Sequence, residues 1–159
     1  MYTTTHATPR GTLTAIVDDD EVVHAAGFTT PEVLADRMQI DPPPVRTGTP
    51  TAATIRRYLD GDLSALDELA IDQPGTAFQQ QVWTALRAVP AGETATYSEL
   101  AQRIGRPAAV RAVGTACGRN LVAPFVPCHR AVRTDGSLGG YLYGLDVKDW
   151  LLRHESGHH

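Results

Sequence analysis

The chain has 159 residues, of which 42% are hydrophobic, and its formal net charge is −4. This size fits one ordinary domain or two small ones with a real hydrophobic core. No stretch approaches the roughly 20 apolar residues of a membrane span, and the first residues lack the charged and apolar regions of a signal peptide. We therefore expect a cytoplasmic protein without a membrane partner.

The two cysteines, Cys117 and Cys128, are too few for a disulfide framework. They are also too few for a thiolate zinc site unless several histidines join them, so both are predicted to be free thiols. His6 and His24 are scattered candidate ligands without partners. The sequence therefore predicts no metal site, and a metal in the first half stays an open question.

The two halves of the chain differ in charge. Residues 1–75 carry five basic and twelve acidic side chains, whereas residues 76–159 carry nine basic and six acidic ones. Residues 103–133 contain six arginines and no carboxylate, a pattern suited to a phosphate-rich partner such as DNA. Genomic base composition is an alternative explanation, but it accounts for Arg in place of Lys and not for the missing acids.

The first half reads as a small α/β unit. Two β-prone runs, 12–17 and 21–28, flank the acidic turn 18–20 and predict a hairpin at the start. Helices are expected over 31–39, after an N-capping Thr and a first-position Pro, and over 51–59. Nothing in this half concentrates chemical groups. The stretch 69–75, ending in Pro-Gly, is the natural junction between domains 1–74 and 75–159.

The second half begins with an amphipathic pattern that predicts a helix over 77–88. Thr96 and Glu99 stand three residues apart in a capping-box arrangement, which predicts a helix through Ile104. Arg106-Pro107 is expected to start the next helix, which closes near Gly118. Two short helices joined by a glycine turn predict a helix-turn-helix.

The outward face of that second helix is expected to carry small residues and one long side chain, Arg111. The small residues are Ala109, Ala112, Thr115 and Ala116. A reader of the major groove needs side chains that reach base edges, so this face suits the minor groove with little sequence discrimination. Tight helix packing is an alternative reason for small residues at these positions.

The residues with the clearest chemical signal are Pro127-Cys128-His129-Arg130, which follow the apolar run 121–126. Positive charge near a cysteine favours the thiolate, which is the nucleophile, so Cys128 is the candidate reactive group. The alternative is a cysteine that serves as a small buried hydrophobe.

Four segments form an ordered set: Gly75 to Trp83, Pro90 to Tyr97, Ala112 to Gly114, and Pro127 to Arg130. With Asn120 upstream and Glu155 downstream, this set resembles the O6-alkylguanine-DNA alkyltransferases, also called methylated-DNA–protein-cysteine methyltransferases. The resemblance covers about Gly75 to Glu155. It implies an N-terminal α/β domain with a ribonuclease-H-like sheet and a mainly α C-terminal helix-turn-helix domain that carries the active-site cysteine.

The resemblance also implies a function, namely DNA repair by direct damage reversal. A methylated-DNA–protein-cysteine S-methyltransferase moves an alkyl group, mainly methyl, from O6 of guanine in double-stranded DNA to its cysteine, here Cys128, in one turnover. Whether O4 of thymine is also a target stays open. The implied partner is alkylated duplex DNA bound through the minor groove by a monomer, and no cofactor is implied.

Catalytic roles follow from the same resemblance. His129 would act as the base through a water, Glu155 would orient it, and Asn120 would hold the turn that presents Cys128. Tyr97 would push on a phosphate and donate a proton to guanine. Taken alone, His129 would read as a surface histidine, Glu155 as a solvated charge and Tyr97 as a core aromatic.

Arg111 would fill the space that the extruded base leaves. The full set expected to contact DNA is Tyr97, Ala109, Arg111, Ala112, Thr115, Ala116, Arg119, Arg130 and Thr134. The set expected to line the substrate pocket is Cys117, Ala131, Tyr141, Leu142 and Tyr143.

The chain departs from some family members at two places. Leu142 and Tyr143 are bulky where those members carry small residues, so we expect a narrow pocket that prefers methyl to benzyl adducts. Cys117, which needs no reactive role, is expected to stay unalkylated.

Three other functions fit parts of the sequence. An alkylated-DNA-binding protein without transferase activity is the alternative, but such relatives commonly have Trp in place of the cysteine. A transcription regulator would need base-reading side chains on the second helix. A cysteine peptidase normally has its Cys and His far apart in sequence.

Overall fold

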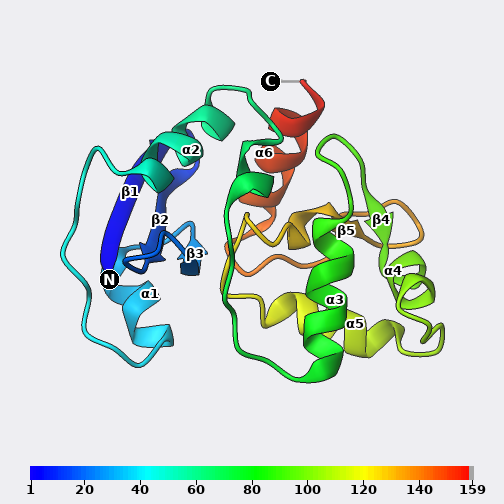
Figure 1. Cartoon of the computed structure of the whole chain (residues 1–159). Coiled ribbons are helices and arrows are strands. Elements are labelled where there is room, and N and C mark those ends of the chain that lie inside the picture. The colour runs from blue at the N-terminus through cyan, green and yellow to red at the C-terminus, as the bar shows by residue number, and fades with distance from the viewer. Residues whose placement is uncertain (158–159) are drawn as a thin grey trace. The chain divides into compact units, whose positions relative to one another are not determined.

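The computed structural model describes residues 1–157, which form two compact units (Figure 1). The first unit contains Met1–Gln73 together with Leu121–Phe125, and the second contains Pro74–Asn120 together with the chain from Val126 onward. Each unit has its own buried core.

The first unit is built on a three-stranded antiparallel sheet in the order β1-β2-β3, with β1 at Tyr2–Thr8, β2 at Gly11–Val17 and β3 at Val23–Gly27. The hairpin expected at β2 and β3 is present. It is not the start of the fold, however, because β1 precedes it and pairs with β2 from Tyr2↔Val17 to Thr8↔Gly11. The run of threonines in β1 reads as polar, although Thr is a β-branched strand former.

Two helices pack on this sheet. Helix α1 (Pro31–Arg37) contacts β2 and β3, where Leu34 and Ala35 join Ile16 and Ala25 in a buried cluster. Helix α2 (Pro50–Leu59) contacts β1, and the short 3-10 helix η1 (Ala65–Glu68) follows it. Thr30 and Thr49 each accept a hydrogen bond from a backbone N–H in the first turn, so side-chain caps fix where both helices begin.

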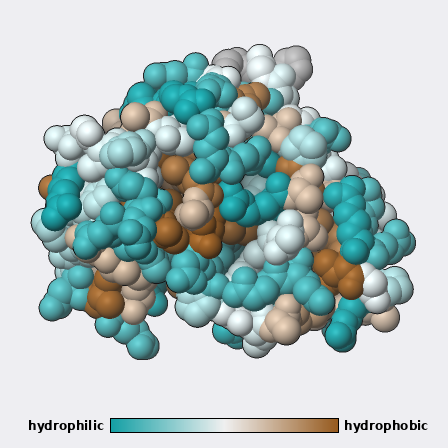
Figure 2. All heavy atoms as spheres, viewed as in Figure 1, coloured by the Kyte–Doolittle hydropathy of each residue, from teal (hydrophilic) through white to brown (hydrophobic). Residues whose placement is uncertain are grey.

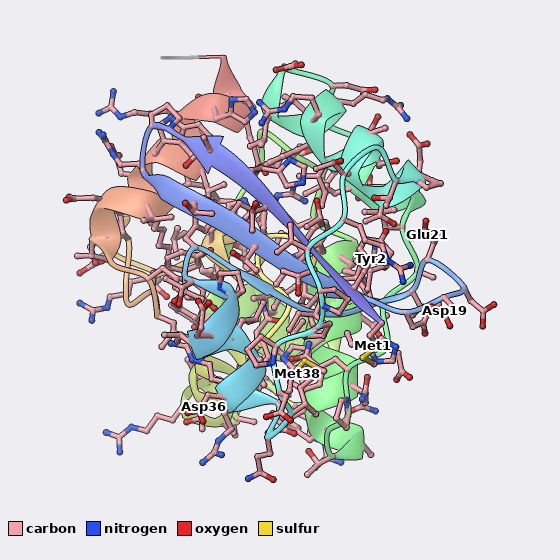
Figure 3. The ribbon with its side chains drawn as sticks, turned by 90° about the vertical axis from the view of Figure 1, so that its left-hand side faces the viewer. Met1, Tyr2, Asp19, Glu21, Asp36 and Met38 are labelled. Carbon is pink, nitrogen blue, oxygen red and sulfur yellow. The ribbon has the colours of Figure 1, made fainter. Side chains whose placement is uncertain are left out.

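Polar contacts tie the β2–β3 turn to the rest of the first unit (Figure 3). The Tyr2 hydroxyl donates to the Glu21 carboxylate, and Thr51 in α2 donates to the same oxygen at 3.1 Å. Glu21 has a φ of 61°, a left-handed backbone that a non-glycine residue adopts only when its surroundings hold it there. The amino group of Met1 lies 3.6 Å from Asp19 in the same turn.

The second unit is mainly helical, with α3 (Ala77–Arg87), α4 (Tyr97–Arg103), α5 (Val110–Gly118) and α6 (Leu145–Ser156). Two short strands, β4 (Ala95–Thr96) and β5 (Ala131–Val132), pair in parallel, and the 3-10 helix η2 (Cys128–Arg130) leads into β5. Helix α3 packs against α4 and α5. Trp83 donates its indole N–H to the carbonyl of Ala116 at 3.0 Å, which joins α3 to α5.

The capping box at Thr96 and Glu99 forms as the spacing predicts, and it sets the start of α4. The expected start of α5 at Arg106-Pro107 is wrong, because the helix begins at Val110. Instead, Ala109 donates its N–H to the carbonyl of Arg106 at 2.9 Å. Pro107 therefore lies in a turn, a position that its fixed φ favours as well as a helix start.

Most of the face shown in Figure 2 is hydrophilic, with several hydrophobic groups of atoms among the polar ones. None of the helices in the described residues 1–157 is both long and apolar enough to span a bilayer.

Replacing Thr96 by Ala should lower the free energy of unfolding by about 1 kcal/mol, because it removes the side-chain acceptor that caps α4. Urea denaturation measures this change. Thr94→Ala, at an exposed position just before β4, is the control and should change stability by less than about 0.5 kcal/mol. Equal effects of the two substitutions would contradict a specific role of the cap.

Candidate active site

Cys128 begins η2 and is buried, with 8% of its surface exposed. Its N–H donates to the carbonyl of Val126 at 2.9 Å, and Asn120 donates its side-chain amide both to that carbonyl at 2.8 Å and to the Cys128 sulfur at 3.3 Å. Asn120 therefore fixes the turn and the sulfur with one amide group. Cys117 is also a free, buried thiol.

Cys128 opens into a pocket of about 370 Å³ within the second unit. The residues that line it are Tyr97, Gly114, Cys117, Gly118, Cys128, Arg133, Gly139, Gly140, Tyr141 and Leu142. Two residues expected in this set do not line it. Ala131 is fully buried in β5, and the ring of Tyr143 packs edge-on against that of Tyr141 at 5.9 Å.

His129, Arg130 and Glu155 form a buried network behind η2. The guanidinium of Arg130 donates to both carboxylate oxygens of Glu155 at 2.9 Å, and His129 Nε2 lies 2.9 Å from Glu155 Oε2. Arg130 also donates to the carbonyl of Val89, just after α3, at 2.6 Å. The readings of His129 as a surface histidine and Glu155 as a solvated charge are wrong, since both are buried.

The network sets the charge states of its members. Burial alone would raise the pKa of Glu155, but His129 and Arg130 outweigh it and hold that pKa well below its ordinary value. Burial lowers the pKa of His129. The Glu155 carboxylate acts in the opposite direction on the His129 pKa but does not outweigh burial, so the imidazole is uncharged at neutral pH, as a proton acceptor must be.

The resting state of Cys128 differs from the expectation drawn from its neighbours in sequence. Arg130 faces Glu155 rather than the sulfur, and burial raises the pKa of the Cys128 thiol. The amide of Asn120 and the charge of Lys148 oppose that rise. The thiol is therefore protonated at rest and needs a base to become a nucleophile.

Lys148 is a site residue that the sequence patterns missed. It is fully buried in α6, and its ammonium donates to the carbonyls of Ala131 at 2.7 Å, Gly140 at 3.2 Å and Leu138. It also lies 5.9 Å from the centre of the Tyr97 ring. One signal was available, because Lys148 is the only lysine in a chain whose other basic residues are all Arg.

Tyr97 is the first residue of α4 and forms one wall of the pocket. Burial, and then the sulfur atoms of Cys117 and Cys128, raise its pKa to about 12, while the charge of Arg133 acts in the opposite direction. Its phenol is therefore protonated at neutral pH. A Cβ at Gly139 would come within 2.9 Å of the Tyr97 hydroxyl, so a glycine is required at this close approach.

Most residues expected to contact DNA are at the surface. Arg111, Ala112, Thr115, Arg119 and Thr134 are exposed, and Ala109 is half-buried.

Two members of the expected DNA-contacting set are placed differently. Ala116 is buried beside Val113 and Cys117 on the inner face of α5, with its carbonyl bonded to Trp83. Arg130 is buried in its ion pair with Glu155. Arg133, which was not in the set, lines the pocket. Within residues 1–157, no group of three His, Cys, Asp or Glu side chains is arranged to hold a metal.

Known proteins similar to this chain fall in one family. Residues 77–157 match the family model "6-O-methylguanine DNA methyltransferase, DNA binding domain". The chain is 46% identical over 101 residues to a methylated-DNA–protein-cysteine methyltransferase of Shigella flexneri, an alignment that covers 64% of this chain and 59% of the relative. With the Salmonella typhimurium protein of the same name, identity is 49% over 98 residues, or 62% of this chain and 57% of the relative. The alignments thus span less than two thirds of either relative.

The fold is similar to that of a solved Mycobacterium tuberculosis protein over nearly the whole chain. A crystal structure of that protein, OGT, in complex with DNA superposes with a TM-score of 0.83 at 35% identity. The match covers 99% of this chain and 94% of that one. An α/β first unit and a helical second unit are therefore common to both proteins.

Because burial lowers the pKa of His129 in the folded chain, the free energy of unfolding should decrease as the pH is lowered below about 6.5. The unfolded histidine has a pKa near 6.5, so below this pH the unfolded chain takes up a proton that the folded one does not. Stability from this group is present above 6.5 and is lost as the pH falls toward the folded value. His6, whose pKa burial lowers to about 4, acts in the same direction.

Urea midpoints measured at about pH 7.5 and about pH 5.5 check this linkage. In His129→Gln the drop between the two pH values should be smaller than in the wild type, and in the double variant with His6→Gln it should be smaller still. The Gln amide can still donate to Glu155, which keeps the network closed. A full wild-type drop in His129→Gln would contradict the assignment.

Proposed function

The chain belongs to the methylated-DNA–protein-cysteine methyltransferase family, and we propose that it repairs O6-alkylguanine in duplex DNA by taking the alkyl group onto Cys128. One observation carries the proposal above others. The Cys128 sulfur is held by Asn120 at the wall of a pocket of about 370 Å³, in a chain of this family. A buried cysteine serving only as a hydrophobe needs neither the amide nor the pocket.

The reaction is a displacement at the alkyl carbon. The sulfur forms a bond to that carbon while the carbon–O6 bond breaks, and guanine leaves with the electron pair and is protonated. The product is a thioether, which no group in the site can reverse, so each molecule acts once. Cysteine suits this step because its thiolate is a strong, soft nucleophile near neutral pH.

The thiol proton must be removed first. We assign this to the neutral imidazole of His129 acting through a water, with Glu155 holding the ring through the 2.9 Å contact to Nε2. The charge of Lys148 favours the thiolate once it forms, because it lowers the pKa of Cys128 against the effect of burial. Asn120 adds a hydrogen bond to the sulfur.

Tyr97 supplies the proton to the leaving guanine in this scheme. Its raised pKa, about 12, keeps the phenol protonated at neutral pH until charge develops on the base. The hydroxyl lies at the pocket wall beside Gly139, on the side where a bound base would lie. The neutral guanine then leaves the pocket.

The target base must leave the duplex to reach a buried sulfur, at a cost of a few kcal/mol of stacking. We propose that α4 and α5 form a helix-turn-helix that binds the minor groove through the exposed face of α5. Arg111, the long side chain on that face, would fill the vacated space. The small exposed residues Ala112 and Thr115 would allow close approach with little sequence discrimination.

The remaining assignments concern organisation. We propose an N-terminal domain over 1–74 with a ribonuclease-H-like sheet, supported by the three antiparallel strands and their helices. Residues 75–159 would form the DNA-binding and alkyl-acceptor domain, acting as a monomer. An alkylated-DNA-binding protein without transfer would need no nucleophile, so Cys128 disfavours that alternative.

Incubating the protein with duplex DNA containing O6-methylguanine should add the mass of one methyl group to the intact protein. Peptide mapping should place it on Cys128. Cys117 should remain unmodified, because burial and the neighbouring Cys128 sulfur raise its pKa to about 12. Mass spectrometry of the intact protein and of its peptides measures both.

Cys128→Ala is the matched control and should bind the same DNA without gaining mass. Absence of transfer in the wild type, or release of methyl with repeated turnover, would refute the one-use reaction. Methyl on Cys117 would refute the assignment of the acceptor.

The pocket mouth predicts weak inactivation by O6-benzylguanine. Leu142 lines the pocket, and Tyr143 packs against Tyr141 beside it. We expect these large side chains to hinder sterically the entry of a benzyl group. Replacing Leu142 by Ala and Tyr143 by Gly should speed inactivation, measured as loss of methyl-transfer capacity with time. Leu145→Ala is the control, because Leu145 is as exposed as Leu142, at 51%, but does not line the pocket. Rapid inactivation of the wild type would contradict the prediction.

A further inference from the structure

Arg133 stands at the rim of the pocket because of the register of a two-stranded sheet. Strands β4 and β5 pair in parallel with Ala95 opposite Ala131 and Thr96 opposite Val132. The next residue on each strand is Tyr97 on one side and Arg133 on the other. Both line the pocket that holds Cys128, so the register brings Arg133 to the same edge as Tyr97.

The backbone at Arg133 is fixed by a tight turn. Its N–H donates to the carbonyl of Ser137 at 3.0 Å, and its carbonyl accepts from Gly136 at 3.0 Å. Asp135 closes the turn by accepting from both the N–H and the hydroxyl of Ser137, at 3.0 and 2.7 Å. A cation on this turn is therefore held at a defined place while its side chain stays exposed.

The charges around Arg133 leave its guanidinium available. None of the ion pairs formed within residues 1–157 includes it. The carboxylate of Asp135, two residues away, attracts the guanidinium electrostatically but is hydrogen-bonded to Ser137. Lys148 is a second positive charge that acts on the same region. Next along the two segments, the hydroxyls of Ser98 and Thr134 lie 3.4 Å apart and hydrogen-bond to each other.

An exposed guanidinium without an ion-pair partner is suited to a phosphate, since its planar fork offers paired N–H donors to the phosphate oxygens. We propose that Arg133 binds a backbone phosphate next to the extruded nucleotide, at the rim of the alkyl-acceptor pocket. This assignment rests on the proposed function, because a base that enters the pocket carries its flanking phosphates to the rim. Arg133 is thus a positioning residue and takes no part in bond making.

Equilibrium binding tests the assignment in the Cys128→Ala background, where no transfer disturbs the measurement. The DNA duplex contains one O6-methylguanine, and single phosphates on either side of it are replaced in turn by neutral methylphosphonate. In protein with Arg133 intact, one of these replacements should weaken binding severalfold. With Arg133→Gln added, the same replacement should cost nothing further, and the slope of log affinity against log salt should fall in magnitude by about one.

Arg153→Gln is the matched control, because Arg153 is an exposed arginine of the same unit that pairs with Asp149 and lies outside this pocket. The loss of binding free energy caused by Arg153→Gln should add to the loss caused by each methylphosphonate, whichever phosphate is replaced. The proposal would be overturned if each methylphosphonate weakened binding equally in Arg133→Gln and in protein with Arg133 intact. An unchanged slope of log affinity against log salt in Arg133→Gln would overturn it too.

Methyl transfer by protein with Cys128 intact is measured separately. Failure of that reaction would refute the proposed function whatever the binding cycle shows. Normal transfer with no coupling between Arg133 and a phosphate would refute the role of Arg133 alone.

Discussion

The buried carboxylate of Glu155 is the group on which the arrangement of the site depends. A lone charge at this depth would cost several kcal/mol, and it is tolerated because Arg130 donates to both of its oxygens while His129 lies against one of them. The same contacts join α6 to η2, and Arg130 extends them to the carbonyl of Val89 after α3. Removing one partner would strand a buried charge and loosen the turn that carries Cys128.

Neutralising Arg130 inside this network has a chemical consequence for the sulfur. The guanidinium of Arg130, two residues from Cys128 in sequence, is paired with Glu155 and does not stabilise the thiolate. Burial therefore dominates, raises the pKa of Cys128 and keeps the thiol protonated. A protonated thiol is a weak nucleophile, so the buried sulfur resists stray electrophiles in this state.

Features set by local chemistry were predictable from the sequence, and features set by distant partners were not. The cap at Thr96 and the turn at Cys128 could be recognised because the residues that hold each of them lie within eight positions in sequence. The burial of Arg130 could not be predicted, because its partner Glu155 lies 25 residues away in sequence, on α6. Likewise, Lys148 donates to three backbone carbonyls of β5 and the segment after it, and backbone acceptors leave no pattern of side chains in the sequence.

The pocket divides into two parts that different elements specify. At its inner wall, Cys128 is fixed by the buried hydrogen bonds of Asn120. Its rim comes from the start of α4, the turn after β5 and the glycine-containing loop 139–144. Substitutions in the rim can therefore reshape the pocket opening without moving the Cys128 sulfur. This separation explains how bulky residues such as Leu142 can occupy the rim while the hydrogen bonds that hold the sulfur remain intact.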